Sequence, residues 1–111
     1  MAIEKGSEKI IYILYIMSID KYYKITKYSY DRAKELGVRL KQSRKANYKI
    51  DIFDKMDNYI TSIGHRQYKD YPTYIKNNGK EYADYRRKLF YSRHKNYPKG
   101  SRGWYSSKIL W

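Results

Sequence analysis

Polar and apolar residues alternate most regularly in the middle of the chain, over residues 48–63. In YKIDIF (48–53), the two isoleucines fall on one face of a strand, and the lysine and aspartate fall on the other. The next five residues, DKMDN, have the composition of a turn, and YITSI (59–63) alternates again. The pattern therefore predicts a β-hairpin that ends at Gly64.

Two shorter elements are expected before the hairpin. YYKITKY (22–28) alternates in the manner of a strand. In SYDRAKELG, which follows, Ser29 suits a helix N-cap and Gly37 suits the position just past the last turn, so a short helix is predicted between them. Residues 38–40 begin another extended piece, and KQSRKANYK (41–49) is polar, basic and without apolar periodicity, which predicts a loop.

The pattern becomes helical after the hairpin. Asp70 followed by Pro72 is a helix start, because proline is tolerated in the first turn. A short helix is predicted over residues 71–76, broken at the following NNG, and a long helix over residues 80–95. A proline and two glycines then predict a loop before the terminal WYSSKILW.

This order of elements predicts an α+β domain. Its small antiparallel sheet consists of the hairpin at about 48–63 plus the N-terminal strand, and it packs against the C-terminal helices. We expect one domain over residues 20–111, with residues 1–19 as an extension or an extra strand or helix. The chain ends on Ile-Leu-Trp, and such an apolar end is explained by docking, either into the domain's own core or into a neighbouring subunit.

The one continuous apolar run, IIYILYIM (10–17), raises the question of a membrane or secretory segment. Its eight residues are too few to cross a bilayer, which takes about 20. No small-residue cleavage site follows the run, so we do not expect a signal peptide. The sequence therefore predicts no transmembrane segment.

Composition changes this picture mainly through charge. The 111 residues include 25 lysines and arginines against 11 aspartates and glutamates, a formal net charge of +14. Such a charge favours polyanionic partners such as nucleic acid. There is no cysteine, which excludes disulfides, thiolate metal sites and a cysteine nucleophile. Sixteen tyrosines against two phenylalanines mean that tyrosine must serve both the core and any contact surface.

Candidate catalytic chemistry is sparse. The two histidines do not have helical metal-ligand spacing, and no phosphate-binding glycine loop or glycine-flanked serine is present. Asp51, Asp54 and Lys55 resemble the carboxylates and lysine of a metal-dependent nuclease, but the last two are also ordinary turn residues. We expect no enzyme, no cofactor and no metal site.

Basic residues interleaved with aromatic ones are the strongest functional signal. Cations neutralise phosphates, and aromatic rings stack on unpaired bases. The same mixture is typical of protein–protein interfaces. Beyond Asp84 the chain has no acidic residue. The residues expected to contact nucleic acid or another partner are Lys41, Arg44, Lys45, Arg87, Lys88, Lys95, Arg102 and Trp104.

A helical projection of residues 82–94 separates its arginines. At about 100° per residue, Tyr82, Tyr85 and Leu89 share one face, and Arg86 and Arg93 fall on that same face. A buried arginine is costly unless it is paired. Arg86 and Arg93 are therefore expected either to form structural ion pairs, with the candidate partners Asp51, Asp54, Asp57 and Asp70, or to emerge where the apolar face ends, and we favour pairing for one of the two.

Several blocks together resemble a family of small basic proteins encoded by large DNA viruses of algae and protists. They are KYYKITKYSYDRAKELGV, SIG, DYPTYI, EYADYRRKLFYSRHK and GSRGWYSSKILW, and they cover residues 20–111. Members often begin near the position of Met17, so the first 16 residues depart from the pattern. The resemblance implies a viral origin and a place in the virion or, during infection, in the host cytoplasm or viral factory. It implies no activity and no site.

Two functions remain open from the sequence. The first is a non-enzymatic nucleic-acid-binding protein that coats or packages viral DNA with little sequence preference, since no base-reading motif is evident. The second is a minor capsid or cement protein that binds acidic protein neighbours. The sequence does not predict an oligomeric state.

Overall fold

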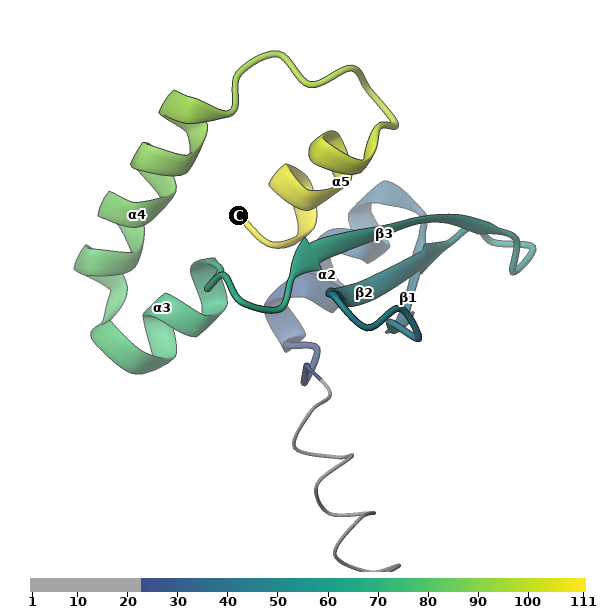
Figure 1. The fold of residues 1–111 in the computed structure, drawn as a ribbon, viewed down its shortest axis with the longest axis horizontal. Helices are drawn as coiled ribbons and strands as arrows, with labels where there is room; N and C mark the ends of the chain where they lie inside the picture. The colour runs from purple at the N-terminus through teal and green to yellow at the C-terminus, as the bar shows by residue number, and fades with distance from the viewer. Residues whose placement is uncertain (1–22) are drawn as a thin grey trace, which may run out of the picture.

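The computed structural model describes residues 23–111, and the expected extension at residues 1–19 lies outside them. The described chain is an α+β fold with a three-stranded antiparallel sheet in the order β1-β2-β3 (Figure 1). The strands are β1 (Arg39–Gln42), β2 (Tyr48–Phe53) and β3 (Tyr59–His65). The helices are α2 (Lys27–Leu36), α3 (Tyr71–Asn78), α4 (Lys80–Arg93) and α5 (Arg102–Ile109). The fold class predicted from the sequence is confirmed.

The predicted hairpin is β2 and β3. Ile50 pairs with Ile63 and Asp51 pairs with Ser62 across it. Asp54 closes the turn, because its carboxylate accepts hydrogen bonds from the backbone N–H groups of Met56 and Asn58, each at 2.9 Å. The hairpin is confirmed, but burial does not alternate along β2, because Lys49 and Asp51 are buried as well as Ile50 and Ile52.

The third strand is not the predicted one. Residues 23–26 are not in a strand, and Lys27 already begins α2. Thr26, not Ser29, is the N-cap, since its side chain accepts from the Ser29 backbone N–H. β1 supplies the third strand instead, so Lys41 belongs to the sheet and the expected loop shortens to residues 43–47.

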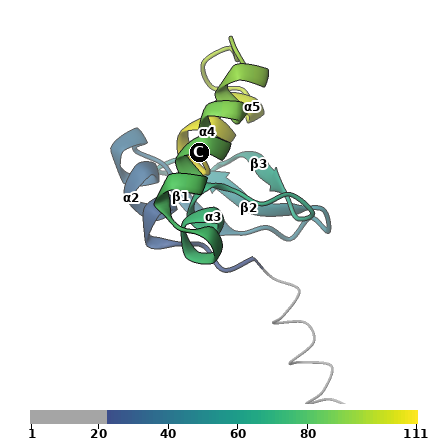
Figure 2. The same cartoon turned by 90° about the vertical axis from the view of Figure 1, so that its left-hand side faces the viewer.

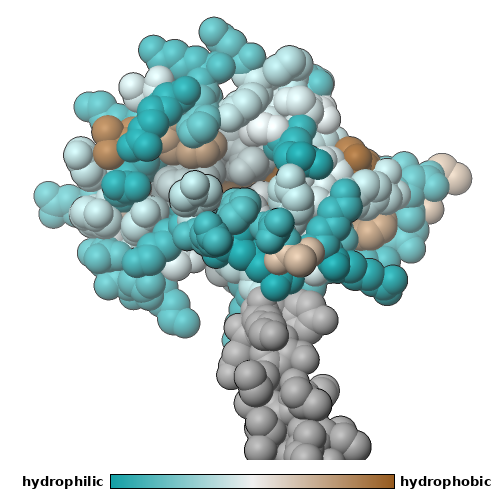
Figure 3. All heavy atoms as spheres, viewed as in Figure 1, coloured by the Kyte–Doolittle hydropathy of each residue, from teal (hydrophilic) through white to brown (hydrophobic). Residues whose placement is uncertain are grey.

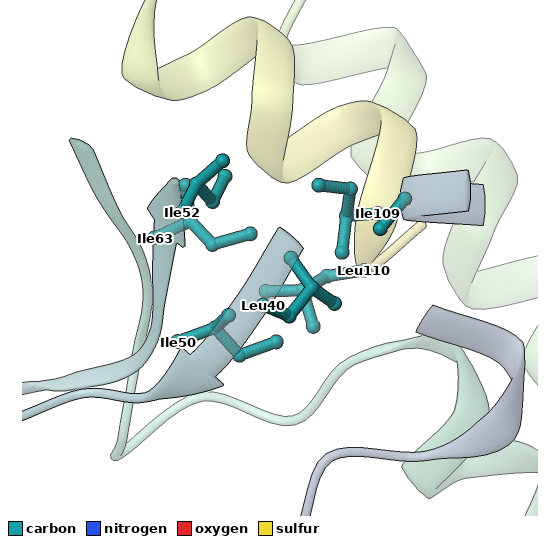
Figure 4. Close-up of a cluster of buried hydrophobic side chains, with 7 residues drawn as sticks. Leu40, Ile50, Ile52, Ile63, Ile109 and Leu110 are labelled. Carbon is teal, nitrogen blue, oxygen red and sulfur yellow. The ribbon is translucent and has the colours of Figure 1, made fainter. Parts of the chain in front are cut away.

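The core lies between the sheet and two helices, α2 and α5 (Figure 4). The buried side chains that form it are Ala33, Leu40, Ile50, Ile52, Ile63, Ile109 and Leu110. Ser29 is fully buried and donates a hydrogen bond to the Ile109 carbonyl at 2.9 Å, which joins α2 to the end of α5. The apolar C-terminus therefore docks into the domain's own core.

Helices α3 and α4 pack on each other and stand beside the sheet core, connected to α5 by an arching loop (Figures 1 and 2). Asp70 caps α3 as predicted, accepting from the Thr73 N–H at 3.0 Å. α4 ends at Arg93, two residues earlier than expected, and α5 is a full helix where a loop and a short segment were expected. This arrangement places α4 and α5 on two sides of one hollow.

Within residues 23–111 no helix has the length and apolar character needed to cross a membrane.

Candidate functional site

A cleft of about 710 Å³ lies between α4, α5 and the end of β3. Its lining includes residues from β2, β3, α3, α4 and α5, from the segment between β3 and α3, and from the C-terminus. We call it the basic cleft and define it by its cations and rings: Tyr48, Lys49, His65, Tyr68, Lys69, Tyr74, Arg86, Phe90, Arg93, His94, Tyr97, Arg102 and Trp111. On the face that Figure 3 shows, hydrophilic side chains predominate and apolar ones form small separate groups.

The only side-chain carboxylate among the residues that line the cleft is already neutralised. Asp70 forms an ion pair with Lys49 at 2.9 Å, and the two side chains are 1% and 5% exposed. Lys49 also donates to the Tyr68 carbonyl. Burial, together with the Asp70 charge, raises the pKa of the nearby Tyr23 phenol above its ordinary value. Lys69 and the three arginines of the cleft form no ion pair with any described carboxylate, so the cleft is strongly positive.

Two of these arginines come from α4, seven residues apart and so on one side of the helix. The Arg86 guanidinium lies over the Tyr74 ring, 5.2 Å from its centroid. Its Nε is buried and has no hydrogen-bond partner among the described residues. Arg93, near the end of the helix, is exposed. A buried donor without an acceptor costs free energy, and Nε of Arg87, which does not line the cleft, is likewise without one among the described residues.

The structural ion pairs expected for Arg86 and Arg93 are not found within the described part of the chain. All four candidate carboxylates have other partners. Asp70 pairs with Lys49, Asp51 accepts from Ser43 and Ser62, Asp54 closes the hairpin turn, and Asp57 pairs with Lys41. The compensation for Arg86 is an aromatic ring instead, which can hold a guanidinium without a counter-charge.

The third arginine, Arg102, opens α5. Ser101 caps this helix by accepting from the Trp104 backbone N–H, and the Arg102 guanidinium lies 4.8 Å from the Tyr48 ring centroid. Tyr48 follows the turn between β1 and β2 directly, and its N–H donates to the Lys45 carbonyl at 3.2 Å. The basic turn (residues 43–47), which the sequence predicts to contact a partner, therefore adjoins the cleft at Tyr48.

Stacked rings form another part of the lining. Phe90 of α4 and the terminal Trp111 stack with centroids 4.4 Å apart and planes 7° from parallel. Tyr97 is hydrogen-bonded to Nδ1 of His94 at 2.7 Å. A Cβ on Gly103 would lie 2.2 Å from the Tyr97 ring, so glycine is required for this approach. These contacts hold the loop between α4 and α5 against the cleft.

Lys41 and Lys45 lie over aromatic rings on the sheet. Lys41 is 4.5 Å from the Phe53 ring centroid, and Lys45 is 5.2 Å from that of Tyr59. A hydrogen bond with Ser62 and the adjacent Lys45 lower the pKa of the Tyr59 phenol. Lys41, Arg44 and Lys45 are exposed, as contact residues must be.

The other predicted contact residues lie in three different settings. Arg87 is half-buried, its guanidinium 3.5 Å from the Tyr71 ring centroid, so it joins α4 to α3 and is a packing residue. Lys88 is exposed. Lys95 and Trp104 both line a second, smaller hollow of about 350 Å³, which shares His94 and Tyr97 with the basic cleft.

Asp51 and Asp54, the carboxylates suggested for a nuclease, both accept hydrogen bonds within the domain. Burial would raise the pKa of Asp51, but hydrogen bonds from Ser43 and Ser62 and from the Arg44 N–H outweigh it and lower that pKa. Both serine hydroxyls lie 2.6 Å from the same carboxylate oxygen. Residues 23–111 contain no group of three or more His, Asp or Glu side chains that could hold a metal ion.

Several cleft residues escaped the sequence analysis because they are far apart in the chain. Tyr68, Lys69 and Tyr74 were not among the expected contacts, and Lys49 was expected only as a member of the basic loop at 41–49. A Tyr-Lys pair occurs at 48–49 and 68–69, but it also occurs at 23–24, outside the cleft, so it is a weak signal. Comparison of this chain with protein-family models, with curated proteins and with solved structures gives no significant match.

Proposed function

We propose that this chain is a non-enzymatic nucleic-acid-binding protein that holds phosphates at the basic cleft and its neighbouring basic turn. The observation that carries the proposal is the cleft's charge. Lys69, Arg86, Arg93 and Arg102 line it, and the one acidic side chain beside them is neutralised by Lys49. Phosphates neutralised by such cations release counterions, which makes binding favourable and salt-dependent.

The aromatic lining supports nucleic acid over a small inorganic anion. A simple anion site needs cations and donors alone, whereas this cleft adds tyrosine, phenylalanine and tryptophan rings. Rings beside cations suit a ligand that presents both phosphates and planar bases. The resemblance to viral proteins supplies a setting, in which the protein would coat or package viral DNA in the virion without reading its sequence.

The test is a salt titration of binding by fluorescence anisotropy with a labelled DNA. Arg93→Gln and Arg102→Gln should each weaken binding and reduce the slope of log K against log salt by about 0.7 to 0.9, one phosphate contact. Lys34→Gln is the matched control, because Lys34 is exposed on α2 and does not line the cleft. Equal effects of all three changes would show non-specific attraction to the whole protein, with no contact at the cleft.

A second function, a minor capsid or cement protein, is favoured by one observation. Ile75, Tyr82 and Tyr85 on α3 and α4 are exposed, and none of them lines the basic cleft. Exposed tyrosines are typical of protein interfaces. Gentle fractionation of virions separates the two proposals, since a cement protein would remain with the shell and a genome-coating protein would remain with the DNA.

A further inference from the structure

We infer that the basic cleft takes an unpaired base, so that the protein prefers single-stranded to double-stranded nucleic acid. This inference rests on the proposed function and adds the form of the ligand. Three properties of the cleft carry it: its size, its unpaired half-buried arginine and its exposed ring.

The size of the cleft suits a nucleotide. Its volume of about 710 Å³ falls within the range of small-molecule sites, roughly 300 to 1,000 Å³. The bases of a duplex are stacked and paired inside it, and enzymes that act on one base must first extrude it into a pocket. A duplex could therefore reach only the rim, whereas a single strand can place one base inside.

Arg86 is the least exposed of the three arginines that line the cleft. Arg86 Nε is buried, and among the described residues nothing accepts its hydrogen bond. Arg93 and Arg102, by contrast, are exposed at α4 and α5. Phosphates of a strand that crosses the opening can neutralise the two exposed guanidiniums. A base carbonyl or phosphate oxygen that enters the cleft can accept from the Arg86 guanidinium, which lines the cleft and has no carboxylate partner among the described residues.

The cleft also has a ring free to stack on a base. Tyr68 is 70% exposed although it lines the cleft, and its nearest ring is His65, with centroids 5.3 Å apart and planes tilted by 53°. An aromatic ring left open to solvent beside cations is the arrangement that single-strand-binding proteins use. Stacking on such a ring does not depend on base identity, which agrees with the lack of a base-reading motif.

The experiment compares three labelled probes of equal length, about 12 nucleotides, in the size range of single-strand sites. They are oligothymidine, an abasic strand with the same phosphates, and a duplex. With the unmodified chain, oligothymidine should bind about tenfold or more tighter than the abasic strand, as expected for a stacked base. Oligothymidine should also bind more tightly than the duplex at equal salt concentration.

Tyr68→Ala should remove most of the difference between oligothymidine and the abasic strand, while affinity for the abasic strand stays the same. The matched control is Tyr85→Ala, because Tyr85 is 55% exposed on α4 but does not line the cleft, and this change should preserve the difference. Circular dichroism of both variants verifies that they are folded.

The outcomes distinguish the inference from the proposed function. Equal affinity for all three probes, or tighter binding of the duplex, would overturn the inference and leave phosphate binding intact. A difference between probes that survives in Tyr68→Ala would overturn the role of Tyr68 as the stacking ring. No binding of any probe at low salt would overturn the inference and the proposed function together.

Discussion

Replacement of Gly64 by alanine adds only one methyl group, but it should lower the free energy of unfolding of the domain. Gly64 lies in β3 with φ at +73°, a conformation that favours glycine. A Cβ at this position would lie 2.6 Å from Cδ1 of Leu110 and 3.0 Å from the Lys49 side chain. Leu110 is 1% exposed in the core and Lys49 belongs to the buried ion pair, so neither can move freely.

The magnitude follows from two contributions. The left-handed conformation costs an alanine about 1 to 2 kcal/mol, partly offset by about 0.4 to 1 kcal/mol because alanine restricts the unfolded chain. Forcing an extra methyl group into a packed core adds about 1 to 3 kcal/mol. Gly64→Ala should therefore lower the free energy of unfolding by about 1 to 4.5 kcal/mol.

Gly37→Ala isolates the first contribution. Gly37 has the same φ of +73°, but its nearest atom is the flexible end of Lys55, at 3.3 Å. This variant should lose only about 1 kcal/mol. Urea unfolding followed by tryptophan fluorescence and by circular dichroism measures both variants. Equal losses for the two would refute the reasoning, because they would show that Leu110 and Lys49 do not restrict the space beside Gly64.

Three further predictions concern the buried polar groups and the C-terminus. Ser62→Ala should raise the pKa of Asp51, which two serine hydroxyls now lower. A lowered pKa contributes stability that is present above the unfolded value of about 3.9 and lost as the pH falls through the folded value. The variant should therefore be less stable near neutral pH. In urea unfolding it should also lose less stability than the unmodified protein as the pH is lowered. Lys49→Met should cost about 3 to 5 kcal/mol by leaving the Asp70 charge unpaired, and the double variant with Asp70→Asn should cost less than the sum of the two, as a double-mutant cycle will show. Trp111→Ala should lower the melting temperature and increase hydrogen exchange of α4, since the terminal ring is stacked against that helix.

Local patterns in the sequence predicted the parts of the fold that depend on local physics. Alternation and turn composition identified the hairpin, Gly37 was placed correctly at a helix end, and Asp70 was placed correctly as a cap. Residues 22–28 misled because alternation over so few residues is compatible with either strand or helix. The helix begins at Lys27, and the Thr26 side chain stabilises its N-terminus by capping it.

The face of α4 was the largest error. Hydropathy placed Tyr82 and Tyr85 inside, yet both are exposed and Ala83 is the one buried residue of the helix. The inner face carries Arg86 and Arg87, which rest on tyrosine rings of α3. The projection placed Arg86 on the inner face correctly, but it cannot represent a cation that packs on a ring in place of an ion pair. The cleft could not be predicted from the sequence, because its side chains come from segments that are far apart in the chain.

Mapping of backbone amide shifts shows whether nucleic acid binds at the basic cleft. Uniformly ¹⁵N-labelled protein is titrated with an unlabelled single strand of mixed sequence. Binding at the cleft should place the largest shift changes on the residues around Tyr68, the last turn of α4 and the first turn of α5. Shift changes concentrated on α2 or on the outer side of α4, or no changes at low salt, would contradict it.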